Sequence, residues 1–230
     1  MKKIQLLLVS MAVVFASCKT STTSTQSAES AKAVRYQNHD QVIEGLIEGN
    51  KRFAEGKTIN YQQGMDYLKQ FDGEQKPYAI VVACSDMKVP VELLFDQGVG
   101  DFIVVRTAAN SPLDKTALGA VELAFNRQAI RTVIVLSHSN CDAVQAVLEA
   151  SPKHREGDLA IEDMVDQLST VLPGLKSSHG DLDKAIEINK KAQLKCLIES
   201  DNLKMAWAEG RVYLLSAHYD EATGVVEFDI

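Results

Sequence analysis

The sequence predicts an α/β fold with a mainly parallel central sheet, flanked by helices and closed by a C-terminal hairpin. Three short apolar runs, at 78–83, 102–105 and 132–136, are typical of strands that are covered on both faces of a parallel sheet. Helical segments alternate with these runs, as in other α/β proteins. A polar turn at 220–224 separates two apolar segments near the C-terminus and predicts the hairpin.

The helices are predicted from apolar residues that recur at intervals of three and four positions. We expect them at 41–53, 91–95, 115–126, 142–150, 162–171 and 182–208. With the strands they form one domain over 38–230, a length that a single hydrophobic core can support.

The composition is that of an ordinary globular protein, with 46% hydrophobic and 24% charged residues. The formal net charge of −7 argues against a nucleic-acid partner, because phosphate binding requires a basic face.

The N-terminus has the pattern of a secretory signal, with positive residues at 2–3 and an apolar run at 4–15. That run is too short to span a bilayer comfortably. The segment Phe15-Ala16-Ser17-Cys18 resembles a bacterial lipobox, in which the cysteine becomes the lipidated first residue. We therefore predict a signal peptide over 1–17 and a polar tether over 18–37 that begins with lipidated Cys18.

This interpretation makes the protein an exported, membrane-anchored lipoprotein of the periplasm or cell envelope. The alternative is an ordinary signal peptide that is cleaved near Ala16, with Cys18 incidental.

Residues that commonly bind metals follow two of the predicted strands. Cys84 and Asp86 come at the end of the first strand, and His138 and Cys141 at the end of the third. The carboxyl ends of parallel strands share one edge, so these side chains can converge. Two thiolates and one imidazole make a three-ligand zinc site with a fourth position for water. From spacing alone, core packing and a disulfide between Cys84 and Cys141 remain alternatives.

Several motifs occur in one order along the chain, at 49–53, 77–86, 89–101, 106–110, 138–141 and 219–224. In content and order they resemble those of the β-class carbonic anhydrases. The resemblance implies a homodimer or larger homo-oligomer that converts carbon dioxide to bicarbonate and a proton with a zinc-bound hydroxide. It also implies that Zn²⁺ is bound by Cys84, His138 and Cys141.

Asp86 and Lys88 are the predicted catalytic residues. Zinc lowers the pKa of bound water, and a neighbouring hydrogen-bond acceptor would orient the resulting hydroxide. Residues i and i+2 of an extended chain point the same way, so Lys88 is expected to hold Asp86. The family has an Asp–Arg dyad here, and its Asp can instead bind zinc and close the site. The resemblance therefore implies both states for Asp86.

Four residues differ from the family pattern. Lys88 stands in place of arginine and offers a single flexible ammonium instead of a planar fork. Ala109, Ser137 and Asp142 replace glycines, so that Ala109 would crowd a close backbone approach and Asp142 adds a carboxylate that can capture Lys88. These differences bear on turnover more than on zinc binding.

Two other functions fit the same motifs. One is a zinc hydrolase of this fold that acts on a sulfur analogue of carbon dioxide, such as carbonyl sulfide. The other is a non-catalytic relative that binds zinc, bicarbonate or a partner.

Overall fold

The computed structural model of the chain describes residues 36, 38–59, 64, 65, 69, 76–128, 130–150, 160–171, 178 and 180–230. All of them belong to the compact unit formed by residues 35–230. The predicted signal peptide, Cys18 and nearly all of the tether lie outside the described residues. In the described part of the chain, no helix has both the length and the apolar character needed to cross a membrane.

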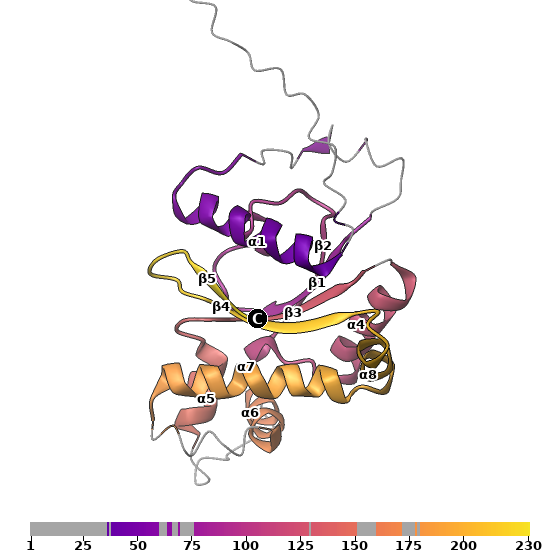
Figure 1. The fold of residues 1–230 in the computed structure, drawn as a ribbon. Coiled ribbons are helices and arrows are strands. Elements are labelled where there is room, and N and C mark those ends of the chain that lie inside the picture. The colour runs from indigo at the N-terminus through magenta and orange to yellow at the C-terminus, as the bar shows by residue number, and fades with distance from the viewer. Residues whose placement is uncertain are drawn as a thin grey trace, which may run out of the picture. The chain divides into compact units, whose positions relative to one another are not determined.

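A five-stranded sheet forms the centre of the fold, with strand order β2-β1-β3-β4-β5 (Figure 1). The strands are β1 (Ala79–Cys84), β2 (Phe102–Thr107), β3 (Thr132–His138), β4 (Tyr213–Tyr219) and β5 (Val226–Asp229). The first four run parallel, and β5 pairs antiparallel with β4. Every residue of β1 and β3 is buried, as expected for strands with both faces covered. The predicted fold class is confirmed.

Helices cover both faces of the sheet, and the predicted helical segments are all present. The observed helices are α1 (His39–Ala54), α3 (Val91–Leu94), η2 (Ala108–Asn110), α4 (Lys115–Arg127), α5 (Asp142–Glu149), α6 (Ala160–Val171), α7 (Leu182–Glu199) and α8 (Asp201–Ala208). Figure 1 shows α1 on one face of the sheet and α7 on the other. The predicted segment 182–208 is divided at Ser200, whose extended backbone (φ −63°, ψ 127°) ends α7 and begins α8.

Alternate residues of the central strands enter two different hydrophobic clusters. Val81 of β1 belongs to the cluster that includes Leu46 of α1. Its neighbour Val82 belongs to the other cluster, with Val121 of α4 and Leu203 of α8. Because successive side chains of a strand point to opposite faces, one apolar run supplies both layers of the core.

Helix α1 is tied to the C-terminal hairpin through one buried side chain, Asn50. Its Nδ2 donates to the Gly224 carbonyl at 2.9 Å, and its Oδ1 accepts from the Val226 N–H at 2.7 Å. At the preceding residue, a Cβ on Gly49 would lie 1.9 Å from the Phe95 carbonyl oxygen, so only glycine fits there. These contacts fix the β4–β5 turn beside the carboxyl ends of the parallel strands.

Candidate metal centre

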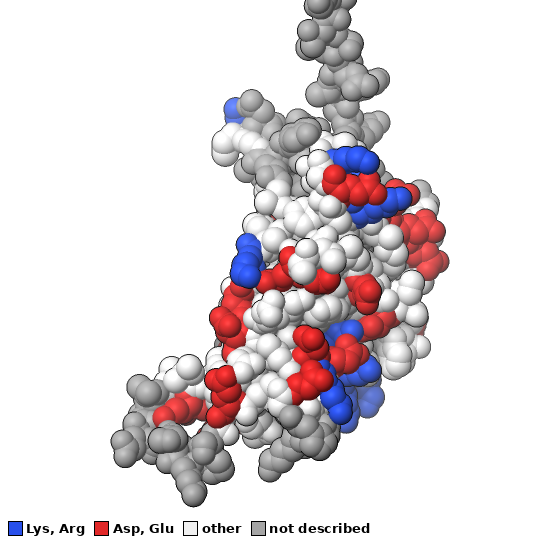
Figure 2. All heavy atoms as spheres, turned by 90° about the vertical axis from the view of Figure 1, so that its left-hand side faces the viewer, with Lys and Arg blue, Asp and Glu red and all other residues white. Residues whose placement is uncertain are grey.

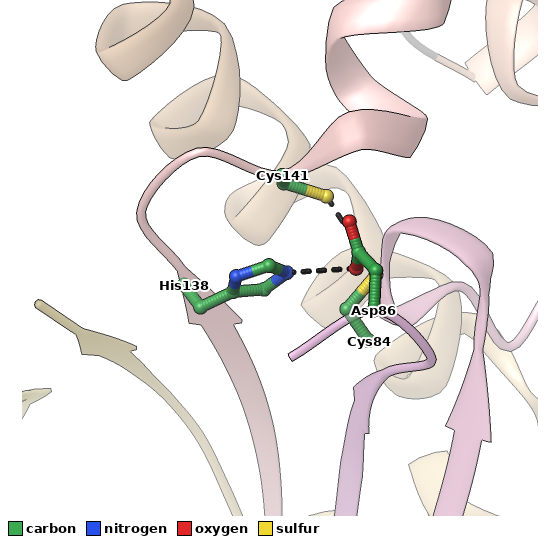
Figure 3. A group of neighbouring side chains, drawn as sticks. All are labelled: Cys84, Asp86, His138 and Cys141. Carbon is green, nitrogen blue, oxygen red and sulfur yellow. Dashed lines mark hydrogen bonds and ion pairs between the residues drawn. The ribbon is translucent and has the colours of Figure 1, made fainter. Parts of the chain in front are cut away.

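Four side chains meet at the carboxyl edge of the sheet: Cys84, Asp86, His138 and Cys141 (Figure 3). One potential ligand atom from each lies within 4.8 Å of the others. Cys84 ends β1, His138 ends β3, and Cys141 is the N-cap of α5. The adjacent pairing of β1 and β3 therefore brings together the residues that the sequence placed at two strand ends.

The two cysteines are free thiols that lie side by side. Their sulfur atoms are 3.6 Å apart, whereas a disulfide bond is about 2.05 Å long. Both side chains are buried, and so is the imidazole of His138. Two thiols, an imidazole and a carboxylate within reach of a single ion form a donor set that suits zinc.

The backbone at Ala109 makes the close approach that an alanine side chain was expected to crowd. Ala109 adopts the left-handed conformation (φ 54°, ψ 31°), which costs about 1–2 kcal/mol for a residue with a Cβ. In this conformation its N–H points to Cys84 Sγ at 3.1 Å. Asn189 of α7 donates to the Ala109 carbonyl at 3.0 Å and helps to hold the turn in place. The alanine is therefore accommodated, and its backbone N–H donates a hydrogen bond to the candidate ligand Cys84.

Arg106 secures the loop that carries Cys84 and Asp86. Its guanidinium donates to the carbonyls of Cys84 at 3.0 Å and Ser85 at 3.4 Å, and also to that of Met87. Arg106 was not predicted to have a role, although its position at the end of a strand within the 106–110 motif was a usable signal.

Asp86 contacts His138 and the backbone of Asp142, whereas Lys88 pairs with a different carboxylate. Its Oδ1 lies 2.9 Å from His138 Nε2, and its Oδ2 accepts from the Asp142 N–H at 2.8 Å. Lys88 Nζ instead lies 2.7 Å from Glu221 Oε2. The predicted pairing of Lys88 with Asp86 was therefore wrong, and Asp142 contributes its backbone rather than capturing Lys88.

The loop geometry explains this correction. The chain bends at Ser85 and Asp86 and again at Lys88, so the i, i+2 relation of an extended strand does not apply beyond Cys84. Lys88 consequently reaches the turn between β4 and β5, while Asp86 faces the cysteines and His138.

Glu221, like Arg106, contacts the site and was not predicted to do so. Besides its pairing with Lys88, its Oε1 lies 3.3 Å from His138 Nδ1. The side chain is only 9% exposed although it belongs to a turn. The motif at 219–224 was recognised, but a glutamate in a turn is expected to be solvent-exposed.

Ser137, which replaces a family glycine, binds the neighbouring strand. Its Oγ donates to the Ala217 carbonyl at 3.2 Å and lies 2.9 Å from His218 Nδ1. The substitution therefore adds hydrogen bonds between β3 and β4 without adding a group to the cluster of four.

The four side chains strongly shift one another's pKa values. A hydrogen bond from Cys141 lowers the pKa of Cys84 to about 5 against the opposing effect of burial, and the same bond raises that of Cys141. Burial lowers the pKa of His138, but its bond to Cys84, the Cys84 charge and Asp86 raise it to about 9. Burial raises the pKa of Asp86, yet its bonds to Cys84 and to the Asp142 N–H lower it overall. These shifts favour negative charge on Cys84 and Asp86 and positive charge on His138.

The fold and the site define an α/β protein with a candidate zinc centre at the carboxyl edge of its parallel sheet. Residues 79–226 match the family described as carbonic anhydrase. A carbonic anhydrase from Mycolicibacterium smegmatis is 33% identical over 186 residues, covering 79% of this chain and 89% of the relative. The chain belongs to the carbonic anhydrase family, and the predicted enzyme class is confirmed.

Solved structures identify the class within that family. A Coccomyxa β-carbonic anhydrase in complex with acetazolamide has a TM-score of 0.61 and 26% identity, covering 82% of this chain and 86% of that one. A β-carbonic anhydrase from Sordaria macrospora, described as tetrameric, has a TM-score of 0.62 and 20% identity, covering 82% and 97%. The fold is that of the β class.

Proposed function

We propose that the protein catalyses the reversible hydration of carbon dioxide to bicarbonate and a proton, with one zinc ion held by Cys84, His138 and Cys141. The observation that carries this proposal is the convergence of these ligand atoms and Asp86 within 4.8 Å. A bound zinc would act as a Lewis acid and lower the pKa of its bound water to about 7. Membership of the carbonic anhydrase family indicates which reaction the site would catalyse.

Asp86 is the residue that would orient the reacting water. Its Oδ2 is fixed by the Asp142 N–H at the start of α5, where the helix dipole favours a carboxylate. Its Oδ1 contacts His138 Nε2. If that nitrogen bound a metal, Oδ1 would be free to accept a hydrogen bond from the reactant. In a closed state the same oxygen would be the fourth ligand.

The charge of the surrounding surface fits a neutral substrate and an anionic product. Figure 2 shows the side from which the β4–β5 turn projects in Figure 1, and acidic side chains predominate there. A negative surface does not repel carbon dioxide, whereas it disfavours retention of bicarbonate.

The direct test of the proposed function is the rate of carbon dioxide hydration by purified protein. A stopped-flow pH-indicator assay would compare zinc-loaded protein with protein stripped by a chelator and then reloaded. Activity should disappear with the zinc and return with it. Protein that holds a full complement of zinc and yet shows no hydration would support the non-catalytic alternative.

We predict that Lys88→Ala changes the hydration rate by less than about threefold at equal zinc content. Lys88 is 76% exposed and pairs with Glu221 rather than with Asp86, so its loss removes no contact to Asp86. The stopped-flow assay on the two proteins, with metal content measured in parallel, checks this. A loss of tenfold or more would instead indicate that Lys88 acts as the family's dyad arginine does.

We also propose that the protein is exported and anchored to a membrane through lipid on Cys18. The lipobox-like segment and the polar tether that follows it support this. Cys18→Ser should move the protein from the membrane to the soluble fraction and abolish incorporation of labelled fatty acid. Cys196→Ser, which changes a cysteine of α7, should leave both unchanged. Equal membrane association of the Cys18 and Cys196 variants would place the anchor elsewhere.

We also propose that the protein assembles into a homodimer or larger homo-oligomer. The tetrameric Sordaria enzyme of the same fold supports it.

A further inference from the structure

Glu221 lies in a position that neither the proposed zinc ligands nor Asp86 accounts for. It belongs to the turn between β4 and β5, yet its carboxylate points inward and is 9% exposed. One oxygen contacts His138 Nδ1, and the other contacts Lys88 Nζ. A carboxylate loses hydration when it is buried, so these two contacts must compensate for that loss.

The two nitrogens of the His138 ring face different partners. Nε2 points toward Asp86 and the two cysteines, as Figure 3 shows for the Asp86 contact. Nδ1 points the opposite way, to Glu221 Oε1 at 3.3 Å. An ionised carboxylate only accepts hydrogen bonds, so Nδ1 must carry a proton to bind it. Nε2 faces the Asp86 carboxylate at 2.9 Å, and in a ring whose Nε2 bound a metal in place of that contact, the one ring proton would stay on Nδ1 beside Glu221.

The turn that carries Glu221 is held in a defined conformation. The Asp220 side chain accepts from the Ala222 N–H at 2.8 Å and from the Thr223 hydroxyl at 2.7 Å. The Glu221 N–H donates to Ser139 Oγ at 3.4 Å. With Asn50 bound to the Gly224 carbonyl, the turn is connected both to α1 and to the segment after β3.

Lys88 supplies the charge that balances Glu221. Its Nζ lies 2.7 Å from Oε2, so the carboxylate bridges an exposed ammonium and a buried imidazole. Lys88, which replaces the family's dyad arginine, therefore pairs with Glu221 instead of Asp86 in this chain.

We propose that Glu221 is a positioning residue, with Lys88 as its counter-ion, that orients the His138 ring and selects the tautomer in which Nε2 binds the metal. This inference rests on the proposed zinc site. Histidines that bind metals commonly donate their other N–H to a carboxylate, and loss of that partner typically weakens metal binding by about 10- to 100-fold.

The test compares Glu221→Ala, Glu221→Gln and the control Glu227→Gln in the full mature chain. Glu227 is an exposed residue of β5, so its substitution removes one negative charge from the same hairpin. Zinc affinity would be measured by competition with a chromogenic chelator. The ¹⁵N shifts of the His138 ring would be measured by NMR in zinc-loaded protein, and circular dichroism would establish that each variant is folded.

Glu221→Ala should weaken zinc binding by about tenfold or more and shift the Nδ1 resonance. Glu221→Gln should lose less affinity, because its amide oxygen still accepts the Nδ1 proton. Glu227→Gln should bind zinc within about twofold of the unchanged protein, since it lacks a contact to the imidazole. If Glu221→Ala fails to fold, Glu221→Gln provides the test. Its Nδ1 resonance should shift, and its zinc affinity should lie between that of the unchanged protein and that of a His138→Ala variant.

Zinc affinity and ring resonances in folded Glu221 variants that equal those of Glu227→Gln would overturn the inference. Unchanged protein that binds zinc but does not hydrate carbon dioxide would overturn the proposed reaction only, because affinity and ring resonance do not require turnover. Unchanged protein that binds no zinc would overturn both.

Discussion

Replacing Cys84, His138 or Cys141 with alanine should remove most of the bound zinc and nearly all of the carbon dioxide hydration. Each substitution deletes one of three proposed ligands from a buried site and leaves only two of them beside Asp86. Metal content per chain, determined by mass spectrometry after dialysis against chelated buffer, checks the first effect. Stopped-flow hydration checks the second.

Cys196→Ala is the matched control for this series, because Cys196 is the remaining free thiol among the described cysteines and lies on α7. It should retain about one zinc per chain and the unchanged rate. Full zinc occupancy in all three ligand variants would show that the metal is bound elsewhere.

Zinc affinity should rise with pH between about 6 and 8, because binding must displace protons from the site. The pKa of His138 is raised to about 9 and that of Cys141 is raised as well, so both are protonated in the metal-free protein. Cys84, with a pKa of about 5, is already a thiolate in this range. An affinity that is independent of pH would contradict this ligand set.

Asp86→Asn should lower the hydration rate by on the order of a hundredfold while zinc stays bound. Asparagine has one acceptor oxygen, and the Asp142 N–H that now binds Oδ2 would engage it. The amide NH₂ would then face the reactant and donate where a hydrogen-bond acceptor is needed. The measurement is the hydration rate at saturating carbon dioxide, normalised to zinc content.

Asp201→Asn, at the first turn of α8, removes the same charge away from the site and should leave the rate unchanged. An Asp86→Asn variant with full zinc and the rate of this control would mean that Asp86 has no part in the reaction.

Local sequence patterns were sufficient to predict most of the fold. Continuous apolar runs predicted β1 and β3 because a strand with both faces covered has no solvent-facing positions. The cluster of candidate ligands was predictable for a related reason: residues that directly follow neighbouring parallel strands must lie at one edge. The division of 182–208 at Ser200 was not predicted, because one non-helical residue hardly alters the apolar periodicity on either side.

The sequence by itself determined which residues can bind a metal, whereas the tertiary structure decided which charges meet around them. Glu221 is 83 residues from His138 and 133 from Lys88, so no local periodicity relates the three. Their contacts exist because β4 pairs with β3 and the next turn then lies over the end of β3. Bends after Cys84 direct Lys88 to that turn and leave Asp86 with His138 and the Asp142 N–H. Ion pairs depend on distance in space, and only the packed sheet brings these distant segments within hydrogen-bonding range.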